Sequence, residues 1–172
     1  MNKQEFINKV SELGINLTEE QLVQLDTYCN FLLEYNSHTN LTAIKEEDQV
    51  YLKHFYDSLT FIKAIDVTKY NNLLDIGTGA GFPGMVLKIV FPNLEVTLLD
   101  SNNKKINFLQ ELSNKLVIDN LVLNVDLFKD IPISFFGVSN EENIKKSSRY
   151  PRAFLFSDLS FLSLIKYSTS GL

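Results

Sequence analysis

Residues 73–84 read LLDIGTGAGFPG, and this stretch constrains the fold of the chain more than any other. Apolar residues lead into Asp75, three glycines alternate from Gly77 to Gly81, and a segment of helical character follows from Met85. This order predicts a strand, a tight turn and a helix start, because glycine supplies the backbone angles of the turn and lets a ligand approach the main chain. The free N–H groups at the helix start would face that ligand.

The spacing of the glycines favours a nucleoside ligand without phosphates. The dinucleotide-binding fingerprint is G-x-G-x-x-G, but Gly81 stands one position too early for it and Phe82 takes the required position. The pattern is instead D-x-G-x-G-x-G, with its middle glycine at Gly79. Residues 94–100 then predict a strand that ends in Asp100, roughly 20 residues beyond the glycines, where a carboxylate can accept both ribose hydroxyls.

Asp75 narrows the choice of ligand further. Its carboxylate can hold the glycine loop or meet a cationic ligand, whereas it would repel a pyrophosphate. S-adenosylmethionine carries a ribose and a sulfonium but no phosphate, so we interpret the loop as an S-adenosylmethionine site. The alternative is an ordinary strand, turn and helix whose glycines only close the turn, and the acid at Asp100 makes this the weaker interpretation.

Length and composition agree with one soluble domain. The chain has 172 residues, of which 45% are hydrophobic, a formal net charge of −5 and one cysteine, Cys29, which we expect to fill the core. We expect no membrane span, no signal peptide and no metal site. A single cysteine fits the cytosol, so we expect a cytoplasmic protein, and we take it to be a monomer, although the sequence does not determine the oligomeric state. The acidic balance is awkward for a nucleic-acid partner, although the only arginines, Arg149 and Arg152, lie together near the C-terminus.

The first third of the chain predicts helices. Apolar residues recur at helical spacing in residues 1–15, and again after Thr18, which forms a capping box with Gln21. Residues 36–42 predict a loop because Asn, Ser and Thr compete for backbone hydrogen bonds. A third helix is expected from about Glu46.

These helices have apolar faces that they cannot bury alone. We therefore expect residues 1–66 to form a helical extension that packs on an α/β core of residues 67–172. His54, Asp57 and Ser58 fall on the third helix, which invites comparison with a hydrolase triad. Residues three and four apart on one helix are neighbours without the converging geometry of a triad, so we reject that interpretation.

The second half alternates strands with helices. Ser101 is expected to cap a helix whose first turn carries Lys104 and Lys105, and residues 121–125 predict a third strand. Solvated lysines are the ordinary explanation for this pair, although a position beside the ligand loop suits a phosphate partner. The alternation predicts a Rossmann-like, parallel, doubly wound α/β sheet with its ligand at the carboxyl ends of the strands.

Several further motifs belong with the glycine loop. They are NLT at 40–42, KHFYDSL at 53–59, TLLDS at 97–101, the lysine pair at 104–105 and FL at 108–109. Together they resemble the bacterial small-subunit ribosomal RNA guanine-N7 methyltransferases, also called glucose-inhibited division protein B, over roughly residues 10–125. The resemblance implies a class I S-adenosylmethionine-dependent methyltransferase that acts on guanine 527 of 16S ribosomal RNA or of the small ribosomal subunit.

The resemblance also assigns residues. Gly77 and Phe82 would line the cofactor site and Asp100 would take the ribose. Residues 151–154, PRAF, resemble the family segment whose arginine lies near the cofactor, so Arg152 is the candidate catalytic residue. We place the lysine pair on the RNA side rather than the cofactor side, because it follows the Asp100 strand by one turn.

Guanine N7 carries a lone pair in the neutral base, so methyl transfer to it needs no general base, and positioning with a suitable field can supply the catalysis. The chain agrees by lacking the Asn/Asp-Pro-Pro-aromatic element typical of exocyclic amine methylation. Two alternatives stay open. One is a small-molecule methyltransferase, and the other is an inactive relative that acts as an RNA-binding or assembly protein.

The chain departs from the family pattern beyond the third strand. Phe128-Lys129 stands where the family usually has an acid near the adenine, and an insertion precedes Arg152. Residues 131–138 predict a weak strand, and residues 153–165 are apolar enough for a strand or a helix. We expect the final strands to be missing, with an incomplete sheet, lower stability and weak turnover as consequences.

Overall fold

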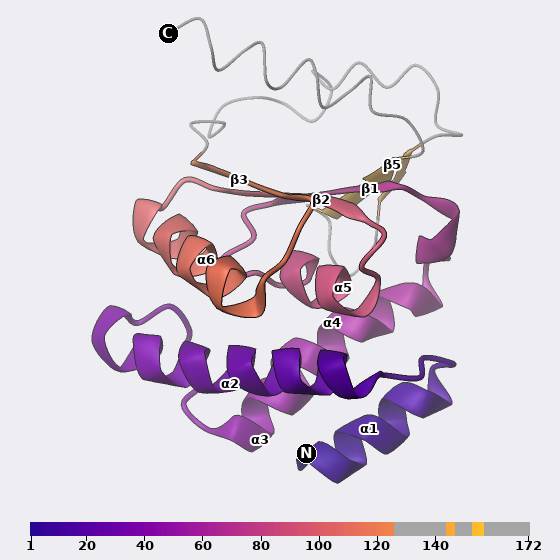
Figure 1. The fold of residues 1–172 in the computed structure, drawn as a ribbon, viewed down its shortest axis with the longest axis horizontal. Coiled ribbons are helices and arrows are strands. Elements are labelled where there is room, and N and C mark those ends of the chain that lie inside the picture. Colours follow the sequence, from indigo (N-terminus) through magenta and orange to yellow (C-terminus); the bar gives the residue numbers. More distant parts are fainter. Residues whose placement is uncertain (126–143, 147–152, 157–172) are drawn as a thin grey trace, which may run out of the picture.

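A computed structural model of the chain describes residues 1–125, 144–146 and 153–156 (Figure 1). The sheet is covered on one face by α5 and α6, and the N-terminal helices form a further layer beneath them. The elements in chain order are α1 (Lys3–Glu12), α2 (Glu19–Thr39), α3 (Glu47–Val50), a π-helical segment (Tyr51–Tyr56), α4 (Asp57–Leu59), 3₁₀ turns at Thr60–Lys63 and Val67–Lys69, β1 (Asn72–Ile76), α5 (Gly84–Val90), β2 (Glu95–Asp100), α6 (Asn103–Leu116), β3 (Leu121–Val125), β4 (Ile144–Lys146) and β5 (Ala153–Phe156).

The described strands form one sheet in the order β3-β2-β1-β5-β4. β1 pairs with β2, and β2 with β3, in parallel, which confirms the predicted Rossmann-like α/β core. β5 runs antiparallel to β1, and β4 antiparallel to β5, so the prediction of a wholly parallel sheet is wrong at this edge. Ala153–Phe156 is therefore a strand, whereas the predicted strand at residues 131–138 and the Phe128-Lys129 position lie outside the described residues.

The parallel register places the ends of β1 and β2 side by side. Ile76 is the partner of Leu99, so the residue after β1, Gly77, leaves the sheet beside Asp100 at the end of β2. Parallel strands present their carboxyl ends at the same edge, where α/β folds bind their ligands. The parallel pairing of these two buried strands is thus what brings the glycine loop and the second acid together.

The helical boundaries differ from the sequence prediction in informative ways. The capping box of Thr18 and Gln21 is confirmed, but α2 continues to Thr39 through most of the predicted loop and ends at Asn40 in the left-handed conformation. The polar residues of that stretch bond back to the preceding turn, as Thr39 does to the carbonyl of Tyr35. The cap of α6 is Asn102 rather than Ser101, because the Asn102 side chain accepts from the amide of Lys104.

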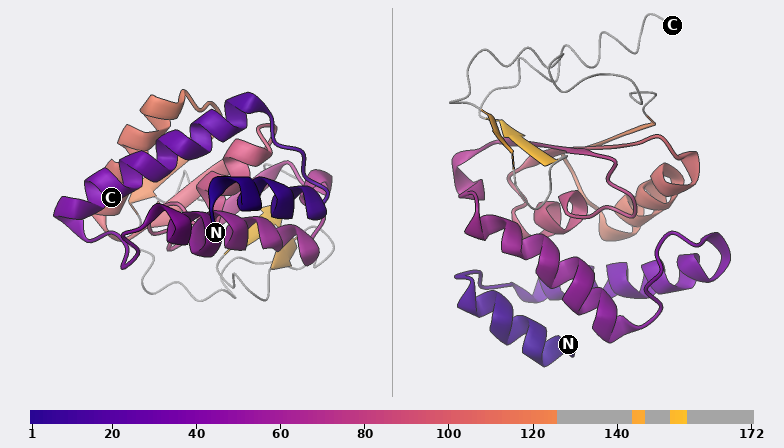
Figure 2. Two further views of the ribbon diagram at one scale, coloured as in Figure 1. Left: turned by 90° about the horizontal axis from the view of Figure 1, so that it is seen from below. Right: turned by 180° about the vertical axis from the view of Figure 1, so that it is seen from behind.

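The predicted third helix is not regular. It consists of α3, a π-helical segment at Tyr51–Tyr56 and the short α4. Figure 2 shows from behind that this run leads from the N-terminal layer up towards the sheet. Wider turns of this kind are rare and often occur at functional sites.

A single hydrophobic cluster joins the N-terminal helices to the α/β half. Phe6 and Leu32 belong to the same buried cluster as Leu87, Leu98 and the apolar face of α6. Cys29 is buried within it, as predicted. The division into a 1–66 extension and a 67–172 core stays a prediction, but the two parts share one core. Among the described helices none is long and apolar enough to cross a membrane.

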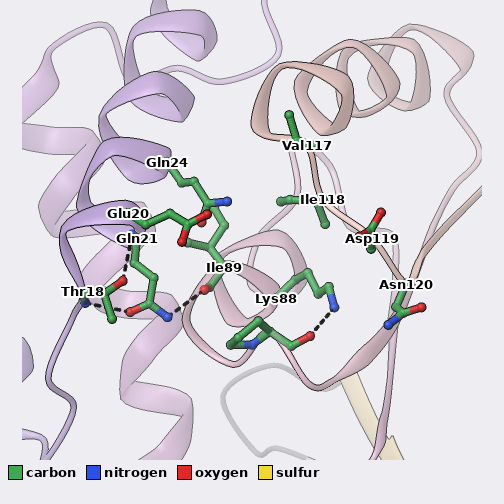
Figure 3. A pocket seen from close by; sticks show the side chains of 11 residues that line it. Thr18, Glu20, Gln21, Gln24, Lys88, Ile89, Val117, Ile118, Asp119 and Asn120 are labelled. Atoms are coloured by element: carbon green, nitrogen blue, oxygen red, sulfur yellow. Dashed lines mark hydrogen bonds between the residues drawn. The ribbon is translucent and has the colours of Figure 1, made fainter.

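The amino end of the sheet is fixed by a buried lysine. Lys88, only 4% exposed, donates from Nζ to the carbonyls of Pro92 and Leu94, each at 2.6 Å. These bonds close the turn between α5 and β2 beside a hollow of about 430 Å³ (Figure 3). Burial lowers the pKa of Lys88, which the charges of Asp119 and Glu95 partly offset.

We expect Lys88→Met to lower the free energy of unfolding by about 2–4 kcal/mol, because two carbonyls lose their donor while the aliphatic stem stays in place. Urea denaturation measures this change. Lys9→Met on the exposed side of α1 is the matched control and should change stability by less than about 0.5 kcal/mol. Equal effects of the two variants would contradict the assigned role of Lys88.

Candidate cofactor site

The glycine loop continues the sheet before it turns. The amides of Gly77 and Thr78 both donate to the carbonyl of Leu99, at 2.7 and 2.9 Å. Gly77, Gly79 and Gly81 then have φ values of 70°, 65° and 101°, in the left-handed region that side chains resist. The alternation of glycines in the sequence therefore reports three positions of positive φ, and the prediction of a strand, turn and helix is confirmed.

Gly79 is the glycine with open space above it. A Cβ at this position would meet no atom of the described residues within 4 Å, and the Gly79 amide donates to Oδ2 of Asp100 at 2.9 Å. Gly79 thus combines an uncrowded backbone with a hydrogen bond to the carboxylate that ends β2. A ligand there can approach the main chain and the acid together.

Gly81 and Gly84 serve packing instead. A Cβ on Gly81 would lie 2.6 Å from the Tyr28 hydroxyl and 2.9 Å from Leu109, and one on Gly84 would collide with Leu98 and lie 2.8 Å from Oδ2 of Asp75. These glycines let the loop close onto α2 and β1. A side chain on Gly81 would therefore point into the core, and the predicted cofactor role of Gly81 stays a prediction.

Asp75 lies behind the loop and holds it. It is 2% exposed, and its Oδ2 accepts from Oγ1 of Thr78 at 2.8 Å and from the amide of Gly84 at 2.9 Å. Burial raises the pKa of Asp75 to about 7; the two hydrogen bonds lower it, and the charge of Asp100 raises it further. Of the two roles left open for Asp75, the geometry supports the loop-holding one.

Asp100 is the acid on the ligand side. Its Oδ2 accepts from Gly79 and from Nζ of Lys105 at 3.3 Å, and its Oδ1 accepts from the amide of Asn102 at 2.9 Å. A carboxylate offers about four acceptor sites, so three are engaged and the Lys105 bond is the one a side chain can release. Lys105, predicted on the RNA side, thus pairs in this structure with the carboxylate predicted to take the ribose, and its RNA role stays a prediction. Lys104 is exposed, and its RNA role stays a prediction.

An aromatic group that the sequence analysis did not identify braces the loop. Phe82 stacks on Tyr28 of α2, with ring centroids 5.5 Å apart, and on His54, with centroids 4.1 Å apart and planes inclined by 4°. Tyr28 also donates its hydroxyl to the carbonyl of Ala80. The only signals in the sequence were aromatic residues at helical positions, which usually fill a core.

These residues fit S-adenosylmethionine on the evidence of the loop itself. The open space above Gly79 admits a ligand at the main chain, and Asp100 offers a ribose acceptor beside it. Arg152, the predicted catalytic residue, lies outside the described residues. Within residues 1–125 and the two short strands, no group of three or more His, Cys, Asp or Glu side chains could hold a metal ion.

The strand order and the parallel pairing of β1 with β2 define the class of fold, a Rossmann-like α/β domain with a glycine-rich loop at the carboxyl ends of its strands. The chain belongs to the rRNA small subunit methyltransferase G family, GidB, whose family model matches residues 21–126.

Relatives named ribosomal RNA small subunit methyltransferase G agree with this. One from Bacillus velezensis is 50% identical over 119 residues, which are 69% of this chain and 50% of the relative. One from Streptococcus pyogenes serotype M12 is 49% identical over 122 residues, 70% of this chain and 52% of the relative. One from Exiguobacterium sibiricum is 44% identical over 124 residues, 72% and 52% of the two chains. The chain thus spans about half the length of the curated relatives it matches.

The two kinds of glycine predict different mutational costs. Gly81→Ala should lower the free energy of unfolding by about 2–4 kcal/mol, because the new Cβ meets Tyr28 in addition to the strain of positive φ. Gly79→Ala should cost only about 1 kcal/mol, as should the control Gly14→Ala, where φ is 83° and no atom in the described part of the chain lies within 4 Å of the new Cβ. Chemical denaturation measures all three. Equal losses at Gly79 and Gly81 would contradict the packing role of Gly81.

Asp75 predicts a pH dependence of stability. Its pKa of about 7 in the folded chain exceeds the ordinary 3.8, so between these values the folded state binds more protons and its stability falls as the pH rises. Asp75→Asn lacks this slope. We expect the stability of Asp75→Asn relative to wild type to increase by about 2–4 kcal/mol from about pH 4.5 to about pH 7.5.

Urea denaturation at the two pH values gives the difference. The half-buried His54, with its pKa lowered to about 4 by desolvation, contributes an opposite slope to both proteins, which cancels in the comparison. Parallel pH profiles of the two proteins would mean that Asp75 is ionised in the folded chain throughout this range.

Proposed function

We propose that this chain is the S-adenosylmethionine-binding part of an enzyme that methylates N7 of a guanine in 16S ribosomal RNA, guanine 527 by the family resemblance. The observation that carries the cofactor assignment is the Asp100 carboxylate hydrogen-bonded to the uncrowded Gly79, with 2.9 Å between Oδ2 and the Gly79 amide. Membership of the rRNA small subunit methyltransferase G family supports the RNA substrate.

Three residues would hold the cofactor. Asp100 would accept from the ribose hydroxyls after Lys105 releases Oδ2, Gly79 would let the ligand lie against the main chain, and Gly77 would supply the positive φ that starts the loop. Phe82 would act mainly by fixing the conformation of the loop and less by touching the ligand, because Tyr28 and His54 already stack on its ring. Asp75, buried behind the loop, would act by holding Thr78 and Gly84.

For this methyl transfer the protein would need only to position the two reactants and to provide a suitable electrostatic field around the sulfonium. S-adenosylmethionine supplies an activated methyl group, and the guanine N7 lone pair accepts it without a general base. The loop then acts by fixing the donor, and the negative charge of Asp100 favours a cationic ligand near the carboxyl ends of β1 and β2. Arg152 is our candidate for the catalytic side chain near the cofactor.

The proposed methyl acceptor, N7 of a guanine, indicates which partner the protein would bind. N7 lies on the major-groove edge of guanine, so the base must be presented in an open loop of the RNA, and the small ribosomal subunit is the natural context. Lys104 is exposed one turn beyond Asp100, where it could meet a phosphate. We further propose a cytoplasmic protein that works as a monomer.

The test has two stages. Isothermal titration with S-adenosylmethionine establishes whether the loop binds the cofactor. Methyl transfer to undermethylated small subunits, followed by chemical cleavage at N7-methylguanine, then identifies the acceptor base. Cofactor binding with transfer only to small molecules would favour a small-molecule methyltransferase, and RNA binding without transfer would favour an assembly protein.

Asp100→Asn is the variant that tests the site most narrowly. The amide oxygen can still accept from Gly79, but the charged acceptor for the ribose is lost, so cofactor affinity should fall by about 1–3 kcal/mol. Calorimetry measures the change, with Glu95→Gln at the exposed, opposite end of the same strand as control. An unchanged affinity in folded Asp100→Asn would remove Asp100 from the site.

A further inference from the structure

His54 reaches the glycine loop from the N-terminal half of the chain. It lies in the π-helical segment Tyr51–Tyr56, whose neighbours Tyr51 and Phe55 are fully buried in the core. Its imidazole stacks on Phe82 with ring planes only 4° apart. A histidine that lies flat on a loop residue restricts where that residue can go.

A hydrogen-bonded chain fixes the imidazole in turn. Nε2 of His54 is 3.0 Å from Oγ1 of Thr42, which also accepts from the amide of Ile44 at 3.2 Å. Thr42 is held by Asn36 of α2, whose Oδ1 accepts the Thr42 amide at 2.9 Å and whose Nδ2 donates to the Thr42 carbonyl at 2.9 Å. Asn36 is buried, so the series of hydrogen bonds from Asn36 through Thr42 to His54 starts from a side chain that is fixed in the core.

The two rings that stack on Phe82 come from different elements. Tyr28 belongs to α2, and His54 belongs to the π-helical segment that follows α3. The loop amides themselves make short-range bonds, from Gly81 and Phe82 to the carbonyl of Thr78, both at 3.0 Å. Nothing in those bonds fixes the direction of the Phe82 ring, so the stacking partners must do so.

We propose that His54 is a positioning residue that holds the glycine loop in its ligand-binding shape through Phe82, with Thr42 and Asn36 fixing His54. The proposal rests on the proposed cofactor site, which it deepens by extending that site to the N-terminal helices. The loop shape then depends on residues that are far from the glycines in the sequence and do not touch the ligand.

The experiment compares side chains at position 54. His54→Ala should weaken binding of S-adenosylhomocysteine by roughly 3- to 15-fold, the loss expected for one aromatic pair and one hydrogen bond. His54→Phe should restore affinity to within about 3-fold, because a flat ring can still stack on Phe82 while Thr42 keeps the Ile44 amide. His38→Ala, at the exposed end of α2, is the matched control and should bind as wild type.

Hydrogen exchange gives a second readout that needs no ligand. In His54→Ala the amides of Phe82 and Gly84 should exchange roughly 3- to 15-fold faster, while those of α1 and α6 keep their wild-type rates. His54→Leu, which fills a similar volume without a flat ring, should show the same change and serves if the alanine variant does not fold.

The two readouts separate the two proposals. A wild-type chain that binds no S-adenosylhomocysteine would defeat the cofactor site, yet faster loop exchange in His54→Ala would still support the positioning role. Wild-type exchange at Phe82 and Gly84 in folded His54→Ala or His54→Leu would overturn that role. So would a phenylalanine variant as impaired as the alanine variant.

Discussion

The contact between Tyr28 and the glycine loop is the constraint on which the rest of the site depends. The loop can approach α2 only because Gly81 has no side chain, since a Cβ there would lie 2.6 Å from the Tyr28 hydroxyl. Tyr28 in return donates to the carbonyl of Ala80 and stacks on Phe82. The N-terminal helices therefore determine the shape of the loop, which makes them part of the site rather than an appendage to it.

Asp75 and Asp100 have different roles because the loop separates their environments. Asp75 sits on the buried side, where desolvation raises its pKa and its oxygen holds the loop from behind. Asp100 sits on the open side, also largely buried, but with Gly79, Asn102 and Lys105 as donors. Asp75, with a pKa of about 7, can thus be partly protonated at neutral pH while Asp100 keeps its own donors, although both lie near the carboxyl ends of neighbouring strands.

Sequence patterns predicted the elements that repeat and missed those that depend on distant contacts. Glycine alternation and the apolar strands located the loop and Asp100, because positive φ and strand burial leave local signals. The role of Gly81, the pairing of Lys105 with Asp100 and the stacking of His54 were not predictable, since each depends on a partner that only the fold brings near. The antiparallel pairing of β5 likewise has no local signature, because Ala153–Phe156 reads as an apolar strand in either direction.

The central claim is that the loop between β1 and α5 is a cofactor site whose shape depends on Tyr28 and His54 as well as on the loop itself. Nuclear magnetic resonance of the isotope-labelled chain during titration with S-adenosylhomocysteine tests this claim most directly. The account predicts saturable shifts of the amides of Gly77, Gly79 and Asn102, together with a smaller response of the His54 ring through Phe82. Saturable binding that shifts other residues and leaves the Gly79 amide unmoved would contradict it, as would no binding at all.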